Sequence, residues 1–479
     1  MENKIMPPST KRYLNSIILI AVDFISLILP ALIIFFISNH TQYPISLSIS
    51  KKWMVIHYFV SIFSLTIIGV KFKHYSYRKT FWYELKEIIQ ILFFSMLIEA
   101  TILALMKIEL SRIIFFSIWF LSLVFIPNLR MLVKGILNRI DFWKRETIII
   151  GNKFNAIDAY KAINSEQSLG FKVINFISDK DKIDHSSHDI IDNIPIIYTD
   201  INYLQNIKNK QTQFIIAVEE NEYFIRKAWI KELMLQGFRN VIIIPAIKGM
   251  PLNGIHMSFI FSHEMILLHI HQDISKPLYK IFKRTFDIII TSCIILCISP
   301  IFIFLYFKVR KDGGPAMYGH ERVGQGGKKF KCLKFRSMHV NSKELLKELL
   351  ATNENARKEW NLNFKLKNDP RVTKIGAFLR KTSLDELPQL FNVLKGDMSL
   401  VGPRPITEVE LKRYEQDVSY YLLVKPGITG LWQVSGRSET DYETRVYFDI
   451  WYVKNWSIWN DIVILLKTIK VVLAKDGAY

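Results

Sequence analysis

Long apolar runs dominate the first part of the chain. They cover residues 14–38, 53–70, 88–106 and 112–133, and polar or basic segments separate them. Each run is close to the ~20 residues that an α-helix needs to cross the hydrocarbon core of a bilayer. The first run is too long for the apolar core of a signal peptide and lacks a clear small-residue cleavage site. The pattern therefore predicts a four-helix transmembrane bundle over residues 1–140.

Basic residues are concentrated in two of the segments that flank these runs. These residues are Lys71, Lys73, Arg78, Lys79 and Lys86 between the second and third runs, and Lys134, Arg139, Lys144 and Arg145 after the fourth. Because positively charged loops stay on the cytosolic side, we expect the N-terminus and everything after residue 135 to lie inside the cell.

Two carboxylates, Asp23 and Glu99, fall within the apolar runs. A carboxylate in the membrane is costly and can mark an ion pathway. A transporter of this kind, however, would be expected to show paired segments broken by Gly or Pro, and the four runs do not repeat in that way. We therefore interpret Asp23 and Glu99 as partners in hydrogen bonds between helices.

Residues 141–265 show a different pattern, in which short β-rich runs alternate with polar helical stretches. The runs cover residues 147–150, 171–177, 214–218 and 240–244. Such alternation predicts a parallel sheet covered by helices. The first run ends at Gly151, but the next residues lack the further glycines of the G-x-G-x-x-G motif that binds a pyrophosphate. We expect a degenerate α/β Rossmann-like domain that serves subunit contact or regulation, with cofactor binding as the alternative.

A fifth apolar segment covers residues 285–307. The basic residues Lys276, Lys280, Lys283 and Arg284 precede it, and Lys308, Arg310 and Lys311 follow it. A straight crossing would place one of these clusters outside, against the charge rule. Ser299 and Pro300 break the segment in the middle, because proline bends a helix and serine can satisfy the freed carbonyl. We predict a re-entrant membrane helix that enters and returns, with a kinked full crossing as the alternative.

The composition agrees with a membrane protein that acts on anionic partners. Half of the residues are apolar, and 63 Lys and Arg against 43 Asp and Glu give a net charge of +20. This excess favours anionic lipids, phosphorylated substrates or nucleic acid as partners. No nucleic-acid-binding motif or isolated basic arm accompanies it, so we do not expect nucleic acid. Cys293, Cys297 and Cys332 are too few for a disulfide framework, which indicates a reduced, cytosolic catalytic part.

Residues 276–479 carry the candidate chemistry, and their first element after the apolar segment is a predicted β-hairpin. Runs at 316–323 and 329–335 flank the turn sequence Gly-Gln-Gly-Gly. The second strand and its end carry cations without an acid, namely Lys328, Lys329, Lys331, Lys334 and Arg336. Lys334 and Arg336 are the better candidates for binding a phosphate-rich ligand, because apolar neighbours limit their freedom. Lys328 to Lys331 could equally form a solvated or lipid-facing edge.

An acidic pair, Asp385 and Glu386, follows the basic residue Arg380. The pair can open a helix with Ser383 as N-cap in an S-x-x-E pattern, or with Asp385 as N-cap, which avoids a lost backbone bond at Pro388. In both cases the exposed N–H groups of a helix N-terminus favour the anionic form. Capping accounts for one carboxylate but not for two beside a cationic tract. The presence of the second carboxylate needs an explanation other than capping.

Two further arginines are held in Gly- and Pro-rich sequence. Arg404 lies in Gly-Pro-Arg-Pro, a rigid frame that could orient its guanidinium to bind a phosphate bidentately. Arg437 follows Ser-Gly, close to Trp432, which we interpret as a core residue. The closing stretch is rich in Trp and apolar residues and fits a helix in the membrane interface. Together these patterns predict a mainly α catalytic domain with a small β-hairpin.

Seven motifs occur here in one order. They are Lys283-Arg284-x-x-Asp287, Ser299-Pro300, Arg322-Val-Gly, Lys334-Phe-Arg-Ser-Met, Thr382-Ser-Leu-Asp-Glu-Leu-Pro-Gln-Leu, Gly402-Pro-Arg-Pro and Pro426-Gly-Ile-Thr-Gly-Leu-Trp-Gln-Val. This set resembles the bacterial polyprenyl-phosphate hexose-1-phosphate transferases, and the whole chain is similar to the long form of that family. The C-terminal sequence, including Ser435-Gly-Arg437 and the ending Lys475-Asp-Gly-Ala-Tyr479, is most similar to the members that transfer galactose 1-phosphate to undecaprenyl phosphate.

The resemblance implies a specific reaction. A sugar 1-phosphate would pass from a UDP-sugar to undecaprenyl phosphate with release of UMP, as the first membrane step of O-antigen or capsule assembly. Asp385 would be the nucleophile that forms a covalent aspartyl phosphosugar, and Glu386, with Asp385, would bind Mg²⁺. The substrate phosphates would be bound by Lys334, Arg336, Arg380, Arg404, Arg437 and Arg284. A homodimer in the bacterial inner membrane, with anionic lipids as partners, is expected.

Other functions stay open at this point. Asp179-Lys180-Asp181 has the D-x-D form of a metal-dependent glycosyltransferase, which would release UDP instead of UMP. The sugar could be glucose or an N-acetylhexosamine, since no residue by itself reveals which hydroxyl configuration is recognised. A membrane scaffold or regulator of polysaccharide export would need only the four spans and the middle domain, and it would tolerate loss of Asp385.

Overall fold

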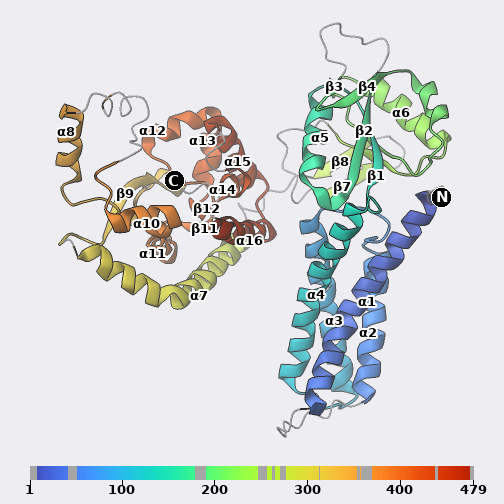
Figure 1. Cartoon of the computed structure of the whole chain (residues 1–479), viewed down its shortest axis with the longest axis horizontal. Helices are drawn as coiled ribbons and strands as arrows, with labels where there is room; N and C mark the ends of the chain where they lie inside the picture. The colour runs from blue at the N-terminus through green and yellow to red at the C-terminus, as the bar shows by residue number, and fades with distance from the viewer. Residues whose placement is uncertain are drawn as a thin grey trace. The chain divides into compact units, whose positions relative to one another are not determined.

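The computed structural model describes residues 8–40, 51–178, 190–245, 256–260, 265–269, 277–311, 313–352, 357, 369–436 and 441–474. The chain forms two compact units, Met1–Ile247 and Lys248–Tyr479 (Figure 1). The Asp179-Lys180-Asp181 motif lies outside the described residues. The three domain ranges expected from the sequence, 1–140, 141–265 and 276–479, stay predictions.

Four long helices begin the first unit: α1 (Pro8–His40), α2 (Lys51–Val70), α3 (Phe81–Leu105) and α4 (Arg112–Arg139). Each is long and apolar enough to cross a membrane. Large apolar side chains such as Ile17, Phe59, Phe94 and Phe120 are exposed on the outside of these helices. Water would not tolerate so much exposed apolar surface, whereas lipid does. The chain is therefore a membrane-anchored, multi-domain protein.

The carboxylates inside these helices bind partners on other segments. Arg130 Nε of α4 donates to Asp23 Oδ1 of α1 at 2.7 Å, and the Tyr75 hydroxyl donates to Asp23 Oδ2 at 2.7 Å. Glu99 Oε2 of α3 lies 3.1 Å from His57 Nδ1 of α2. Asp23 and Glu99 are both fully buried. The expected hydrogen bonds between helices are thus present for both residues.

A six-stranded sheet follows the helices, in the order β3-β4-β2-β1-β5-β6. Its strands are β1 (Arg145–Ile150), β2 (Phe171–Ser178), β3 (Ile190–Ile191), β4 (Ile194–Tyr198), β5 (Gln213–Ile216) and β6 (Val241–Ile243), with helices α5 (Phe154–Ser165) and α6 (Tyr223–Leu235) and the 3-10 turns η1 (Gln167–Leu169) and η3 (Ile201–Asn206). All pairings are parallel except β3 with β4. Along β1, Ile148 and Ile150 join the core on one face and Ile149 the core on the other. The predicted parallel sheet is confirmed.

The turn after β1 differs from a dinucleotide-binding loop. Gly151 has φ +126°, and a Cβ there would lie 2.6 Å from the carbonyl oxygen of Ala217, so close backbone packing explains this glycine. At the start of α5, Glu219 Oε1 accepts a hydrogen bond from the Asn155 N–H at 2.8 Å. A carboxylate of the chain itself therefore occupies the helix terminus where such folds bind a pyrophosphate.

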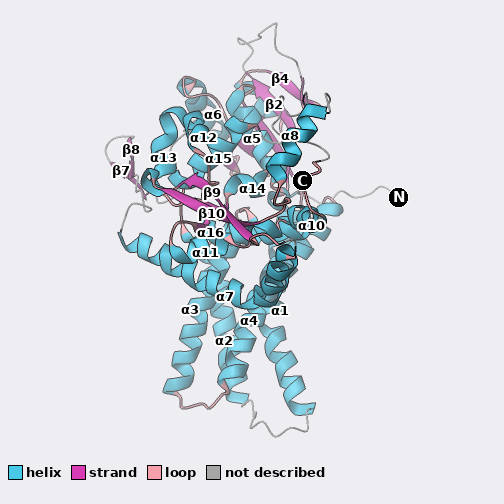
Figure 2. Cartoon of the chain, turned by 90° about the vertical axis from the view of Figure 1, so that its left-hand side faces the viewer, coloured by secondary structure: helices cyan, strands magenta, loops and turns pink. Residues whose placement is uncertain are grey.

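The second unit is mainly helical (Figure 2). Its strands form three pairs: β7 (His256–Ile260) with β8 (Met265–His269), β9 (Met317–Val323) with β10 (Lys329–Phe335), and β11 (Ser399–Val401) with β12 (Gly427–Thr429). Its helices are α7 (Pro277–Arg310), α8 (Ser342–Thr352), α10 (Lys374–Thr382), α11 (Gln389–Lys395), α12 (Glu408–Leu411), α13 (Val418–Leu423), α14 (Leu431–Ser435), α15 (Tyr442–Lys454) and α16 (Ile458–Ala474), with the 3-10 turns η5 (Gln325–Gly327), η6 (Leu384–Glu386) and η7 (Lys412–Asp417). The predicted hairpin is β9–β10.

Helix α7 contains the fifth apolar segment and bends in its middle (Figure 1). Pro300 lies inside it, and Ser299 Oγ donates to the Leu296 carbonyl at 2.9 Å. Near the start, Lys283 Nζ donates to Asp461 Oδ2 at 2.7 Å, and near the end, Val309 packs in a cluster with Phe335 and Leu379. Both ends of α7 thus pack against the same compact unit.

Candidate active site

The β9–β10 hairpin determines the direction of the candidate lysine. In β10, Phe330 and Cys332 are buried in the core of the unit, and Lys334 follows with the same alternation. Lys329 and Lys331 lie on the opposite face and are exposed. Because Lys334 shares the inward face, its side chain is only 24% exposed, and its ammonium group is directed at other side chains.

The acidic pair lies in the short turn η6, between α10 and α11. Ser383 ends α10 with φ 55°, which is a left-handed conformation that reverses the chain. Its side chain makes no capping hydrogen bond, and α11 begins only at Gln389, after Pro388. The predictions that Ser383 or Asp385 caps a continuous helix are therefore wrong. The reason is that Pro388 initiates α11 on its own and leaves the pair in a separate 3-10 turn.

Lys334 links the two carboxylates. Its Nζ donates to Glu386 Oε1 at 2.6 Å and lies 3.6 Å from Asp385 Oδ2. Burial raises the pKa of Asp385, and the charge of Lys334 opposes that rise. Burial disfavours the ammonium of Lys334, but Glu386 and Asp385 outweigh this effect, so the pKa of Lys334 is raised. The three groups form one electrostatic cluster whose cation keeps Asp385 ionised more readily than burial alone would allow.

Two of the predicted arginines, Arg380 and Arg336, form contacts at the segment that follows β10. Arg380 Nε donates to Ser337 Oγ at 2.9 Å, and its charge lowers the pKa of Asp385. Arg336 Nη2 donates to the Val309 carbonyl at 3.0 Å, which connects the exit of β10 to the last turn of α7. Arg380 therefore interacts electrostatically with Asp385, whereas Arg336 contacts the last turn of α7.

The remaining predicted arginines differ in their surroundings. The Arg404 guanidinium lies 5.5 Å from the centre of the Trp432 ring, and burial, followed by the charge of Arg445, lowers its pKa. Arg284 instead uses both Nη atoms to donate to the carbonyls of Val393 and Leu394, at the end of α11. The structure thus gives Arg284 a helix-capping contact that the sequence analysis did not anticipate. Arg437 lies outside the described residues.

Asn392 is a residue that the sequence analysis missed. It is 2% exposed in α11. Its side-chain amide both accepts a hydrogen bond from the backbone of β10 and donates one to it. Leu333 N–H donates to Asn392 Oδ1 at 2.9 Å, and Asn392 Nδ2 donates to the Lys331 carbonyl at 2.9 Å. These bonds fix the strand that carries Lys334 against the helix that follows the acidic pair. An asparagine between apolar residues on both sides was the available signal.

An apolar cavity of about 210 Å³ has Leu387, the residue after the acidic pair, in its lining. It is lined by Ile295, Ile298, Ser299, Phe302 and Ile303 of α7 and by Leu387, Leu390 and Phe391. Leu387 directly follows Glu386 in the chain, so the apolar lining starts one residue after the carboxylates. The site therefore combines a charged cluster with an adjoining apolar surface from the bent part of α7.

The acidic pair has a donor set that suits Mg²⁺. Carboxylate oxygens are hard donors, and Mg²⁺ is usually held by one or two carboxylates together with substrate phosphates. The described residues contain no cluster of three or more His, Cys, Asp or Glu side chains that could hold a metal alone. The ammonium group of Lys334 already contacts both carboxylates, in the place that a bound cation would take. The residues thus fit a metal that is shared with a phosphorylated substrate, not a closed protein site.

The structure describes a membrane-anchored protein with a charged cluster of Asp385, Glu386 and Lys334, and comparison with known proteins identifies its family. The family model "bacterial sugar transferase" matches residues 278–475, and the model "CoA-binding domain" matches residues 72–211. The chain is 49% identical over 447 residues to an undecaprenyl-phosphate galactose phosphotransferase of Salmonella typhimurium, covering 93% of each chain. The chain belongs to the bacterial sugar transferase family, which confirms the resemblance found in the sequence.

Two further relatives cover most of the chain. A UDP-galactose-lipid carrier transferase of Erwinia amylovora is 50% identical over 424 residues, which is 88% of each chain. An uncharacterized sugar transferase of Haemophilus influenzae is 52% identical over 412 residues, or 86% of each chain. The similarity extends through the membrane helices and the middle sheet, because the matches are far longer than the region after residue 277.

Proposed function

We propose that this chain transfers a sugar 1-phosphate from a UDP-sugar to undecaprenyl phosphate and releases UMP. The observation that carries the proposal is the Asp385–Glu386 pair bound to Lys334 within the region that matches the sugar transferases. Galactose is the proposed sugar because the Salmonella and Erwinia relatives have it in their names, with glucose or an N-acetylhexosamine as alternatives. The product would begin the assembly of an O-antigen or capsule repeat.

In the proposed mechanism Asp385 is the nucleophile. Its carboxylate oxygen forms a bond to the β-phosphorus of the donor while the bond from that phosphorus to the bridging oxygen breaks, which releases UMP. An oxygen of undecaprenyl phosphate then attacks the same phosphorus, and the acyl-phosphate bond breaks to restore the carboxylate. The two steps let the soluble donor and the lipid acceptor use the site in turn. The charges of Lys334 and Arg380 favour the ionised, nucleophilic form of Asp385.

Cations near Asp385 would neutralise the diphosphate during transfer. Glu386 and Asp385 would hold Mg²⁺ together with diphosphate oxygens, and Mg²⁺ supplies charge neutralisation when bound. The ammonium group of Lys334 would then donate to a phosphate oxygen instead of to Glu386. Arg336, Arg380 and Arg404 are proposed as further phosphate ligands. Arg437 keeps that proposed role from the resemblance alone.

We place the site at the cytosolic face of the bacterial inner membrane. The bend of α7, the packing of both its ends on one unit, and the basic residues at both ends support a re-entrant helix over a single crossing. A straight helix of 34 residues would extend about 51 Å, more than a bilayer core requires. The apolar cavity between α7 and α11 would accept the first isoprene units of the lipid.

Two partners are proposed beyond the substrates. Anionic lipids fit the net charge of +20, since cytosolic leaflets attract basic segments. A homodimer is proposed through the middle domain, whose pyrophosphate position is occupied by Glu219. We propose that this domain serves subunit contact or regulation, with cofactor binding as the alternative.

The proposal is tested by incubating the purified full chain with undecaprenyl phosphate and one of UDP-galactose, UDP-glucose or UDP-N-acetylgalactosamine. We expect UMP with UDP-galactose and little with the other two. Asp385→Asn should lose activity, whereas Asp417→Asn, at the end of the turn η7, should keep it. UDP as the product would support a glycosyltransferase, and no product with any of the three donors would support a scaffold. Full activity of Asp385→Asn would exclude Asp385 as the nucleophile. Each of these results contradicts the proposal.

A further inference from the structure

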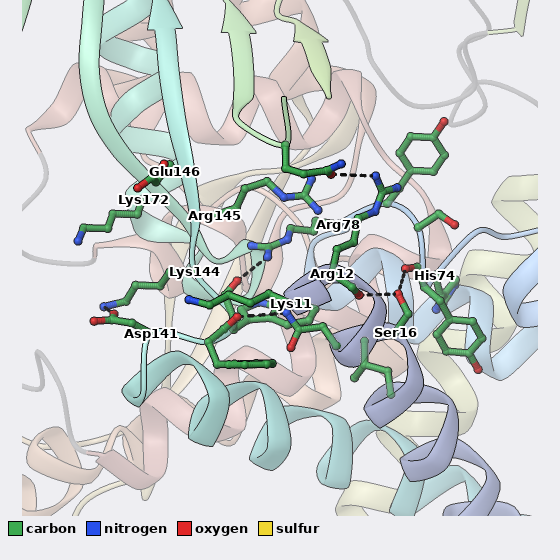
Figure 3. A pocket seen from close by; sticks show the side chains of 18 of the residues that line it. Lys11, Arg12, Ser16, His74, Arg78, Asp141, Lys144, Arg145, Glu146 and Lys172 are labelled. Carbon is green, nitrogen blue, oxygen red and sulfur yellow. Dashed lines mark hydrogen bonds and ion pairs between the residues drawn. The ribbon is translucent and has the colours of Figure 1, made fainter. Parts of the chain in front are cut away.

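A second cavity lies in the first unit, where the membrane helices meet the sheet. Its volume is about 300 Å³. It is lined by the beginning of α1, the segment after α2, and the segment that leads from α4 into β1, with further residues from β2 and from the loop before β5 (Figure 3). All of these elements belong to one compact unit. The cavity is separate from the acidic pair, which is in the other unit.

The cavity has a strong excess of positive charge. Its basic lining residues are Lys11, Arg12, Arg78, Lys144, Arg145 and Lys172. The acidic lining residues are Asp141 and Glu146, and Lys144 already pairs with Asp141 at 2.6 Å. Like charges confined around one space repel one another unless an anion lies between them.

The three arginines have neutral partners. Arg78 donates to the carbonyls of Trp143, Leu169 and Gly170, the last at 2.6 Å. Arg12 Nη1 donates to Gln211 Oε1 at 3.3 Å, and Arg145 Nη1 donates to Gln213 Oε1 at the same distance. Within the part of the chain that the structure describes, none of the three forms an ion pair with a carboxylate. Their charges are therefore oriented but not neutralised.

Burial and mutual repulsion act on the same arginines. Burial, with a contribution from Arg145, lowers the pKa of Arg78 to about 9, and burial, with a contribution from Arg12, lowers the pKa of Arg145 to about 10. Figure 3 shows Arg12, Arg78 and Arg145 grouped together in the cavity. A half-buried cation without a counter-charge is costly, so this group of arginines points to an anion that compensates it.

The cavity lies at an edge of the sheet where nucleotides are not usually bound, which bears on the class of ligand. Arg145 begins β1, and Lys172 lies at the start of β2, so the cavity is at the amino-terminal edge of the sheet. Open α/β folds bind nucleotides at the opposite, carboxyl edge. Asn15, Ser16 and Leu19 of α1 also line it, and the neighbouring Tyr13 and Ile17 are exposed apolar residues at the start of a membrane helix. A ligand here would lie level with the lipid head groups.

We propose that this cavity is a binding site for a phosphate group, with Arg12 and Arg145 as its ligands and Arg78 as the fixed cation behind them. The phosphate could belong to an anionic lipid head group or to a soluble diphosphate. Guanidinium groups bind phosphate oxygens in pairs, which matches the grouping of these side chains. The site is independent of the proposed reaction at Asp385.

The test uses the full chain in phosphatidylcholine nanodiscs, with and without phosphatidylglycerol. In one arm, equilibrium dialysis counts the equivalents of labelled pyrophosphate bound per chain. In the other arm, native mass spectrometry counts the phosphatidylglycerol molecules retained. Arg145→Gln and Arg12→Gln are compared with Arg139→Gln, which removes the same charge from an exposed position outside the cavity. Arg145→Lys keeps the charge and controls for misfolding.

We expect Arg145→Gln to bind the ligand of one arm with about a tenfold weaker Kd than wild type, because a charged hydrogen bond to the phosphate is lost. In that arm the count of bound ligand then falls by one equivalent per chain. Arg139→Gln should bind like wild type, and Arg145→Lys, which keeps the charge but loses the paired donors, should bind more tightly than Arg145→Gln. Loss in the lipid arm identifies a head group, and loss in the pyrophosphate arm a soluble anion. Equal binding by Arg145→Gln and Arg139→Gln in both arms would overturn the proposal.

Discussion

Replacing Lys283 with methionine should destabilise the second unit by detaching the first part of α7. Lys283 Nζ contacts Asp461 Oδ2 at 2.7 Å and the Val401 carbonyl at 3.2 Å. Asp461 is 1% exposed and also accepts hydrogen bonds from Tyr452 at 2.8 Å and Trp456 at 3.2 Å. Loss of Lys283 leaves a buried carboxylate with two neutral donors and no counter-charge.

The size of the effect follows from this environment. Removing one partner of a buried ion pair costs about 3–5 kcal/mol. The two remaining donors and the 15% exposure of Lys283 favour the lower end, about 3 kcal/mol. For a unit of this size each kcal/mol lowers Tm by about 2–4 °C, so we expect a decrease of roughly 6–12 °C. Lys280→Met, an exposed position three residues earlier, should change Tm by no more than about 2 °C.

The pH dependence distinguishes lost charge pairing from lost packing. Burial raises the pKa of Asp461, and Lys283 opposes that rise, so the pKa should be higher still in Lys283→Met. The folded protein then binds a proton that the unfolded chain releases, and stability falls as pH increases through that window. Thermal unfolding in detergent at several pH values should show Lys283→Met approaching wild type as pH is lowered. A deficit that is equal at all pH values, or no deficit, would refute the ion-pair explanation.

Three further predictions concern the site and the membrane helices. Lys334→Met should lower kcat/KM by about 10²–10³-fold. Because the charge of Lys334 opposes the rise in the pKa of Asp385 that burial causes, the acid limb of the pH–rate profile should also move to higher pH. Lys331→Met, on the opposite face of β10, should keep the wild-type profile. Asn392→Leu should lower stability by about 1–3 kcal/mol, measured by thermal unfolding, because a buried N–H and carbonyl of β10 lose their partner; an unchanged Tm would show that the bridge is dispensable. Arg130→Met should lower stability by about 3–5 kcal/mol because Asp23 keeps the Tyr75 hydroxyl but loses its cationic partner, while Arg139→Met should not. Equal effects of the two would contradict the ion-pair assignment.

Much of the architecture was predictable because its signals are local. The apolar length of the membrane helices and the β-rich runs such as 147–150 depend on neighbouring residues only. The hairpin follows from a Gly-rich turn between two β-rich runs. The ordered motifs around Asp385 identified the family, and the comparisons agree. These features need no knowledge of which distant segments meet.

The details that the sequence did not reveal depend on distant contacts. Asn392 serves β10 only because α11 packs beside a strand about sixty residues earlier in the chain. Arg284 contacts the end of α11, which no local pattern connects to α7. The capping of the acidic pair was mispredicted because both registers assumed one continuous helix, whereas Ser383 takes a left-handed conformation and separates two helices.

The most direct measurement of the central claim is a single turnover without the lipid acceptor. The full chain is mixed with UDP-galactose labelled at the β-phosphate, quenched, and digested for peptide mapping. We expect up to one UMP per chain and a label on the peptide that contains Asp385, with neither in Asp385→Asn. A label on another residue, or UMP that forms only after undecaprenyl phosphate is added, would contradict it.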